Sequence, residues 1–175
     1  IRTVRARGIY MENAAPAGSG AMAAVLGMEA SVIEDTIKDI DGVSIANYNC
    51  PGQIVITGEA KGVQQASEAL KEAGARRVLP LNVSGPFHSP MMVPAGEKLK
   101  EVLDGVTTTA LCIPYVANVN AKVIADSGEI KDLLVKQVSS SVRWEQSMET
   151  MIREGVDTFV EIGPGKTLAG FMRKI

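Results

Sequence analysis

His88 is the residue of this chain whose type and surroundings most favour chemistry. It is the only histidine among the 175 residues, and it lies in the segment Ser84 to Met92, between a predicted strand and a predicted helix. Ser89 and Pro90 suit the first positions of that helix, which puts His88 at its entrance. The positive end of the helix dipole disfavours imidazolium, so a neutral ring able to act as a general base is expected. A single histidine can equally be structural, and its position alone does not decide.

Two further polar side chains could act on a substrate. Arg7 lies in Arg5-Ala6-Arg7-Gly8, toward the end of the first predicted helix. Its planar guanidinium could grip a carboxylate through two parallel hydrogen bonds, a geometry that lysine does not reproduce. A solvated helix arginine is the simpler interpretation. Spacing in the sequence does not decide between the solvated and the carboxylate-binding roles of Arg7. Gln137 lies near the end of another predicted helix, where a polar residue is ordinary.

Several glycine and serine segments imitate known functional motifs. Residues 161–166 end a predicted strand and lead into a helix, as a phosphate loop does, but they are not a Walker sequence. Gly18-x-Gly20-x-x-Ala23 imitates a dinucleotide fingerprint, yet Pro16 precedes it where a strand should be, and a strand follows it instead of a helix. We reject a nucleotide role for both. No Gly-x-Ser-x-Gly elbow occurs, so the candidate base has no evident nucleophile.

The elements that must position these residues fall into two groups. In residues 19–82 the apolar periodicity predicts a strand, a helix, a hairpin of two strands, a second helix and a final strand. Their ranges are 21–26, 31–40, 43–48, 53–57, 60–73 and 77–83. The turn Asn49-Cys50-Pro51-Gly52 joins the hairpin strands. This order is that of a ferredoxin-like subdomain, with an antiparallel sheet and two helices on one face.

The remaining residues predict a different layout. Helices are expected at 89–103, 129–138 and 145–154, a buried strand at 113–118 and another strand at 158–162. Strands that alternate with helices favour a parallel α/β layer, which residues from outside this chain would complete. The predicted fold class is α/β: residues 1–18 and 83–175 form part of an α/β-hydrolase-like parallel-sheet subdomain, and 19–82 form an inserted ferredoxin-like subdomain. The chain has no initiator methionine and begins in a predicted helix, so we expect a fragment.

Composition restricts the classes of function. Apolar residues make up 46% and charged residues 22%, as in soluble globular proteins, and the net charge of -2 offers no basic surface for nucleic acid or an anionic membrane. Cys50 and Cys112 form no CxxC pair, so neither disulfides nor a zinc site are expected. No apolar run approaches the length of a membrane span. We expect a cytoplasmic protein without a metal or cofactor.

Five segments, taken in order, resemble bacterial malonyl-CoA:acyl carrier protein transacylases: Val4 to Gly8, Gly20 to Val25, Asn47 to Gly58, Gly85 to Ser89 and Glu161 to Lys166. In that family a serine in a Gly-His-Ser-x-Gly elbow takes malonyl from coenzyme A and passes it to the phosphopantetheine thiol of acyl carrier protein. The resemblance implies that His88 activates the serine and that the backbone carbonyl of Gln137 orients His88. It implies also that Arg7 pairs with the malonyl carboxylate, and that Phe87 favours unbranched malonyl over methylmalonyl, although core packing is its simpler role.

The family's serine elbow does not occur in these 175 residues, so we expect the chain alone to be inactive. The rival interpretation is a non-catalytic module that binds acyl carrier protein or a small effector, with Lys71, Arg76 and Arg77 facing an acidic partner. Charges on the exposed side of a small domain are usually only solvated, so the transacylase interpretation is preferred.

Overall fold

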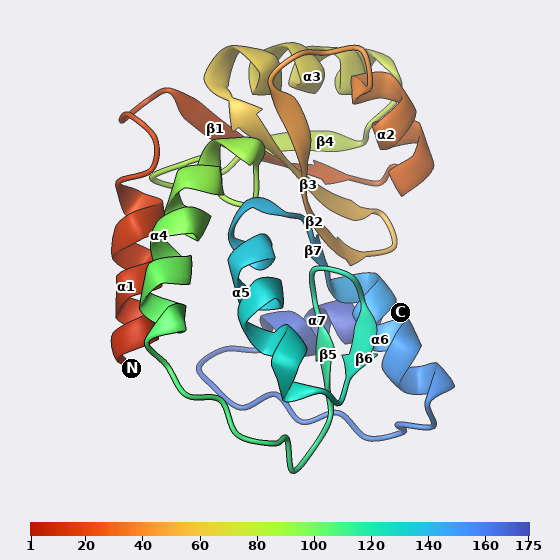
Figure 1. Cartoon of the computed structure of the whole chain (residues 1–175). Coiled ribbons are helices and arrows are strands. Elements are labelled where there is room, and N and C mark those ends of the chain that lie inside the picture. The colour runs from red at the N-terminus through yellow and green to blue at the C-terminus, as the bar shows by residue number, and fades with distance from the viewer.

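A computed structural model describes residues 1–175 and shows a five-stranded sheet lying against a group of helices (Figure 1). The upper part of Figure 1 contains the sheet with two helices on its outer side. Three helices from distant parts of the chain lie side by side beneath it. No helix of the chain is both long enough and apolar enough to span a bilayer.

The sheet is built almost entirely from one stretch of sequence. Its elements follow the predicted order, as β1 (Gly20–Leu26), α2 (Ala30–Ile37), β2 (Val43–Cys50), β3 (Gln53–Glu59), α3 (Ala60–Glu72) and β4 (Arg77–Pro80). The strands lie in the order β4-β1-β3-β2, each pair antiparallel. A two-residue connection joins β2 to β3, and Gly52 in it has a φ of 72°, a left-handed conformation that glycine adopts without strain.

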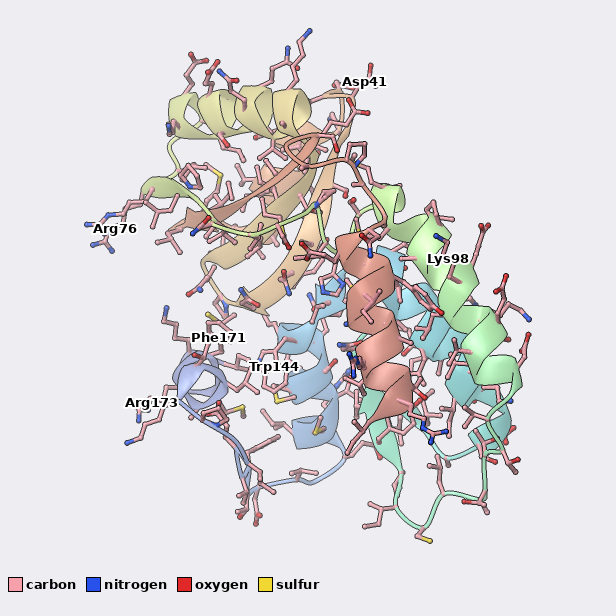
Figure 2. All side chains as sticks on the ribbon, turned by 90° about the vertical axis from the view of Figure 1, so that its left-hand side faces the viewer. Asp41, Arg76, Lys98, Trp144, Phe171 and Arg173 are labelled. Carbon is pink, nitrogen blue, oxygen red and sulfur yellow. The ribbon has the colours of Figure 1, made fainter.

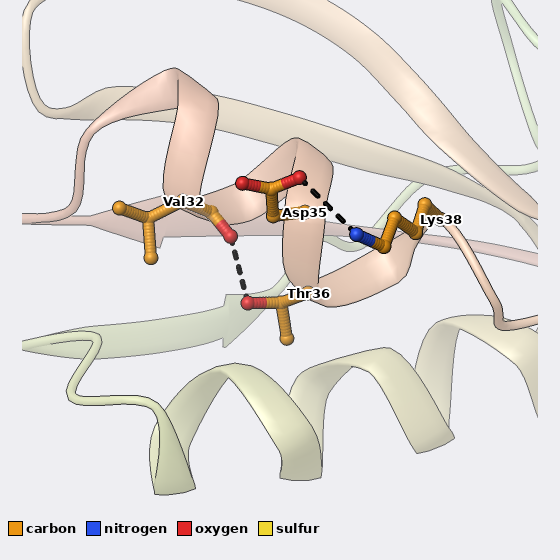
Figure 3. A network of polar contacts seen from close by, with 4 residues as sticks. All are labelled: Val32, Asp35, Thr36 and Lys38. Atoms are coloured by element: carbon orange, nitrogen blue, oxygen red, sulfur yellow. Dashed lines mark hydrogen bonds and ion pairs between the residues drawn. The ribbon is translucent and has the colours of Figure 1, made fainter.

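The face of the sheet toward α2 and α3 carries the largest hydrophobic core. Every second residue of a strand points to the same face of the sheet, and apolar residues spaced by about 3.6 positions lie on one face of a helix. The apolar faces of the strands and of the two helices therefore pack against each other. Ile33, Ile56 and Leu70 are fully buried there. The outer face of α2 is solvated: Thr36 donates to the Val32 carbonyl at 2.7 Å, and Lys38 pairs with Asp35 at 3.5 Å (Figure 3). Such exposed pairs contribute little to stability.

The opposite face of the sheet is covered by the segment that carries His88. Met22, Ala46 and Val55 form a small cluster on this face, and Phe87 packs against it. A Cβ atom on Gly20 would lie 2.4 Å from the Pro86 ring, so only glycine permits this approach. The candidate site is therefore held between the sheet and the helices.

The helical group consists of α1 (Arg2–Glu12), a 3₁₀ turn η1 (Pro90–Met92), α4 (Val93–Asp104) and α5 (Ile130–Ser139). Met11, Met92, Leu99 and Val138 belong to its core. A Cβ atom on Gly96 would lie 3.2 Å from the Val135 carbonyl oxygen, which shows how closely α4 approaches α5. The predicted helix at 89–103 is thus a 3₁₀ turn followed by an α-helix.

The predicted parallel strands are corrected by the structure. Residues 113–118 contain only β5 (Tyr115–Ala117), which pairs antiparallel with β6 (Lys122–Ile124), and Ile113 is 77% exposed. Residues 158–162 form no strand, and Ile162 is 94% exposed. A strand exists only where a neighbouring strand exchanges backbone hydrogen bonds with it, and residues 158–162 make no backbone–backbone hydrogen bond.

One short parallel pairing does form. β7 (Val142–Arg143) lies parallel to β2 and adds a fifth strand to the sheet. The remaining elements are the 3₁₀ turn η2 (Ser127–Glu129), α6 (Trp144–Arg153) and α7 (Thr167–Met172). The helices predicted at 129–138 and 145–154 agree with α5 and α6 within about one residue.

Candidate active site

The backbone around His88 is held in an uncommon conformation by local hydrogen bonds. His88 has a φ of 60°, which few non-glycine residues adopt and which is often found at functional sites. The buried Ser89 hydroxyl donates to the Pro86 carbonyl at 2.7 Å and accepts from the Met91 amide at 3.3 Å. This confirms Ser89 as the N-cap of the turn that leads into α4. Ser84 donates to Glu12 at 2.7 Å, which ties the segment to the end of α1.

The His88 ring is oriented by the end of α5. Its Nδ1 lies 3.1 Å from the backbone oxygen of Gln137. That carbonyl belongs to the last turn of α5, where carbonyl groups have no partner inside the helix and can accept from elsewhere. Because a carbonyl oxygen can only accept, the contact selects the tautomer with hydrogen on Nδ1. The other nitrogen, Nε2, makes no hydrogen bond in the chain and keeps its lone pair available to take a proton.

The surroundings of His88 favour its neutral form. Burial is the largest cause that lowers the pKa of the imidazole below its ordinary value, and the positive charge of Arg7 lowers it further. The backbone groups of Gln137 and Ser140 act in the opposite direction but do not cancel these effects. A ring that is neutral near pH 7 can serve as a general base.

Arg7 points from α1 toward the same place. Its Nη2 donates to Gln137 Oε1 at 2.6 Å across 130 residues of sequence. The guanidinium is half-buried, and burial lowers its pKa. No carboxylate lies within 4.0 Å of it, since the two ion pairs of the chain, Lys38 with Asp35 and Lys100 with Asp104, lie elsewhere. A partly desolvated cation without a counter-ion is a ready site for an anion.

Three of the four predicted site residues therefore meet. Gln137 contacts His88 through its backbone and Arg7 through its side chain, so α1, the segment before α4, and α5 converge on one point. The bond between Arg7 and the Gln137 side chain was not foreseen, because no spacing in the sequence relates residues so far apart.

Phe87 has a packing role that the structure makes explicit. Its half-buried ring contacts the cluster of Met22, Ala46 and Val55 on the sheet and the cluster around Met11 and Met92 in the helices. It thus joins the two parts of the molecule beside His88.

The glycine-rich loop at 161–166 does not present an open anion site. The Glu161 carboxylate accepts from the Leu168 amide at 3.2 Å and the Ala169 amide at 2.9 Å, so it already occupies the start of α7. An apolar groove of about 650 Å³ runs between this loop, α6 and α7, with Trp144 at its edge. Trp144 and Arg173 both line this groove, and Figure 2 shows the Arg173 side chain pointing outward.

Comparisons with known proteins give the family. The family model for the acyl transferase domain matches residues 1–174. The malonyl CoA-acyl carrier protein transacylase of Bacillus subtilis is 52% identical over 179 residues, covering 100% of this chain and 56% of that protein. The Clostridium perfringens malonyl CoA-acyl carrier protein transacylase superposes with a TM-score of 0.96 at 42% identity, covering 99% of this chain and 56% of that one.

A third match is a malonyl-transacylase in complex with a type II PKS acyl-carrier protein. It has a TM-score of 0.95 and 40% identity, and the alignment covers 99% of this chain and 57% of that one. The chain thus spans somewhat more than half the length of the relatives it matches. Its sequence and its α/β fold place it, over nearly its whole length, in the acyl transferase domain family, among relatives named as malonyl CoA-acyl carrier protein transacylases.

Proposed function

We propose that this chain supplies the general base and the carboxylate-binding arginine of a malonyl-CoA:acyl carrier protein transacylase. The observation that carries the proposal is the convergence of His88 and Arg7 on Gln137, at 3.1 Å and 2.6 Å. A neutral imidazole beside an unpaired guanidinium suits an acyl group that needs both proton transfer and anion binding.

The nucleophile in this proposal is a serine outside the 175 residues. Ser84 and Ser89, which flank His88 in sequence, donate their hydroxyls to Glu12 and to the Pro86 carbonyl. Ser141 donates to the Ile45 carbonyl at 2.5 Å. A serine presented to His88 Nε2 from elsewhere would lose its proton to the ring as it attacks.

The reaction then proceeds as two acyl transfers. The serine oxygen attacks the thioester carbonyl of malonyl-CoA, the C–S bond breaks, and the imidazolium of His88 returns the proton to the departing coenzyme A sulfur. In the second transfer the phosphopantetheine thiol of acyl carrier protein gives its proton to His88 and attacks the serine ester. The serine leaves with the proton that His88 received. No metal or redox group is needed for this balance.

Arg7 would distinguish malonyl from acyl groups that lack a second carboxylate. Hydrogen bonds to a charged group contribute about 1.5 to 3 kcal/mol. A preference for malonyl over acetyl of about tenfold or more follows from this range. Phe87, beside His88, would limit the space for a branched unit such as methylmalonyl.

The acyl acceptor in this proposal is acyl carrier protein. Support comes from the structural relative that is described as a complex of a malonyl-transacylase with its acyl-carrier protein. Arg76 projects into solvent at the edge of the sheet (Figure 2), and Arg77 beside it is exposed as well. These cations would favour an acidic partner there.

The division of the fold is proposed on the same basis. Residues 19–82 would form a ferredoxin-like subdomain, and residues 1–18 and 83–175 part of an α/β-hydrolase-like subdomain.

A hybrid enzyme tests the proposed function. The stretch of the Bacillus subtilis transacylase that matches this chain is replaced by the chain, and transfer of malonyl from coenzyme A to carrier protein is measured. His88→Ala should lower kcat by roughly 10² to 10⁴-fold, since an oriented base contributes about that much. Full activity in this variant would show that His88 is not the base.

Arg7→Ala tests the anion site in the same hybrid. The ratio of kcat/KM for malonyl-CoA to that for acetyl-CoA should fall by about tenfold or more, as a charged hydrogen bond predicts. Arg5→Ala, on the exposed side of the same helix, is the matched control and should leave the ratio unchanged. Saturable binding of carrier protein without any acylation would instead favour the non-catalytic module.

A further inference from the structure

We propose that the side chain of Gln137 is a positioning residue for Arg7, and that it sets the selectivity for a carboxylate-bearing acyl group. This role is separate from that of the Gln137 backbone carbonyl, which faces His88. The inference rests on the proposed function. It assigns two roles to Gln137: the backbone carbonyl orients His88, and the side-chain oxygen holds Arg7.

The orientation of the Gln137 amide follows from its neighbours. Oε1 lies 2.6 Å from Arg7 Nη2, and Nε2 lies 3.3 Å from His88 Nδ1. In the reverse orientation an NH₂ group would face the guanidinium at 2.6 Å, with donor against donor. The approach of Nε2 to His88 is a contact without a hydrogen bond, because Nδ1 already donates to the backbone oxygen. The bond to Arg7 therefore decides how the amide lies.

The Arg7 guanidinium depends on this one bond. Gln137 Oε1 is its only hydrogen-bond acceptor in the chain, and no carboxylate pairs with it. A guanidinium carries N–H donors on every nitrogen in a planar fork, so one bond to Oε1 leaves other donors for a carboxylate. One anchored edge fixes the plane in which the remaining donors point.

Anchoring matters because an arginine side chain has many rotamers. A guanidinium that is already held in its binding orientation loses less conformational freedom when the ligand arrives, and affinity rises accordingly. Arg7 and Gln137 come from α1 and α5, and both helices pack against α4. The anchor therefore ties the anion site to the helix end that orients the base.

The variant Gln137→Met tests this role, because it keeps the length of the side chain and the backbone carbonyl but removes the acceptor. In the hybrid enzyme the KM for malonyl-CoA should rise about threefold to tenfold, the range for one lost hydrogen bond. The preference for malonyl-CoA over acetyl-CoA should fall by a similar factor, with a smaller change in kcat. The ¹⁵N signals of His88 should still report hydrogen on Nδ1. Gln65→Met, on the exposed face of α3, is the matched control.

A double-mutant cycle with Arg7→Ala separates positioning from general structural damage. The double variant Arg7→Ala with Gln137→Met should show the same preference for malonyl as Arg7→Ala alone. An additive loss, an equal loss for both acyl donors, or a changed His88 tautomer would overturn the proposal. If Gln137→Met fails to fold, Gln137→Glu replaces it: its carboxylate keeps an acceptor for Arg7 but competes with malonyl, so the preference should again fall.

Binding of free malonate and acetate distinguishes this inference from the proposed function. If the hybrid transfers no malonyl but binds malonate more tightly than acetate, and Gln137→Met removes that difference, the positioning role stands and the transacylase proposal fails. If the hybrid transfers malonyl and Gln137→Met leaves its selectivity intact, only the positioning role fails. Absence of both transfer and anion discrimination would refute both.

Discussion

Tyr48 should make the stability of the protein fall at alkaline pH. Its hydroxyl donates to Glu34 at 2.6 Å, the Arg143 guanidinium carbon lies 5.6 Å from the ring centre, and the residue is 8% exposed. Burial, the hydrogen bond to Glu34 and the charge of Glu34 raise the pKa of Tyr48 from 10.0 to about 12, against the opposing charge of Arg143. The folded protein therefore holds the neutral phenol more firmly than the unfolded chain does.

The direction and the size of the pH effect on stability follow from this difference in pKa. A pKa that is raised on folding contributes stability that is fully present below pH 10 and is lost as the pH rises through about 12. One pKa unit corresponds to about 1.4 kcal/mol, so the free energy of unfolding should fall by about 1.4 kcal/mol at pH 11 and by about twice that amount well above pH 12. Tyr48→Phe lacks the titrating group, so its free energy of unfolding should not show this pH-dependent loss.

Urea titrations at pH 8, 10 and 11 measure the effect. The difference in unfolding free energy between the original protein and Tyr48→Phe should be about 1 to 2 kcal/mol at pH 8, from the lost hydrogen bond. It should shrink as the pH rises above 10, because the phenol of the unfolded chain then ionises while that of the folded protein is still largely neutral. A difference that stays constant over this pH range would refute the account of Tyr48, because it would mean that folding does not perturb the ionisation.

Two further predictions concern the site itself. Arg7→Met should raise the pKa of His88, because burial would then act without the nearby positive charge; the acid limb of the pH profile should move to higher pH, whereas Arg7→Lys keeps the charge and should leave it in place. Gly20→Ala would put a methyl group 2.4 Å from the Pro86 ring, so the His88 segment must shift, with a loss of about 1 to 3 kcal/mol in thermal unfolding. Gly8→Ala, whose Cβ would meet nothing within 4 Å, should not destabilise the protein, and equal effects at the two glycines would contradict the steric argument.

Local patterns were sufficient for most of the elements. The apolar periodicity of residues 19–82 predicted the four antiparallel strands of the sheet and the two helices on its outer face, but not the short fifth strand β7. Ser89 with Pro90 predicted the turn before α4. These features depend on residues close together in the sequence, where propensity, capping and turn chemistry act. The strand predicted at 158–162 was wrong for the opposite reason, since a strand depends on a neighbour and the chain provides none.

The sequence alone determined which side chains could act, namely the lone imidazole of His88 and the guanidinium of Arg7. It also determined the order of the elements that carry them. Their meeting at Gln137 was decided only by tertiary structure. Packing of α1 and α5 against α4 brings Arg7 to a side chain 130 positions away, and the end of α5 gives His88 an acceptor 49 positions away. Contacts at such separations depend on how helices pack, and no local pattern of residues encodes them.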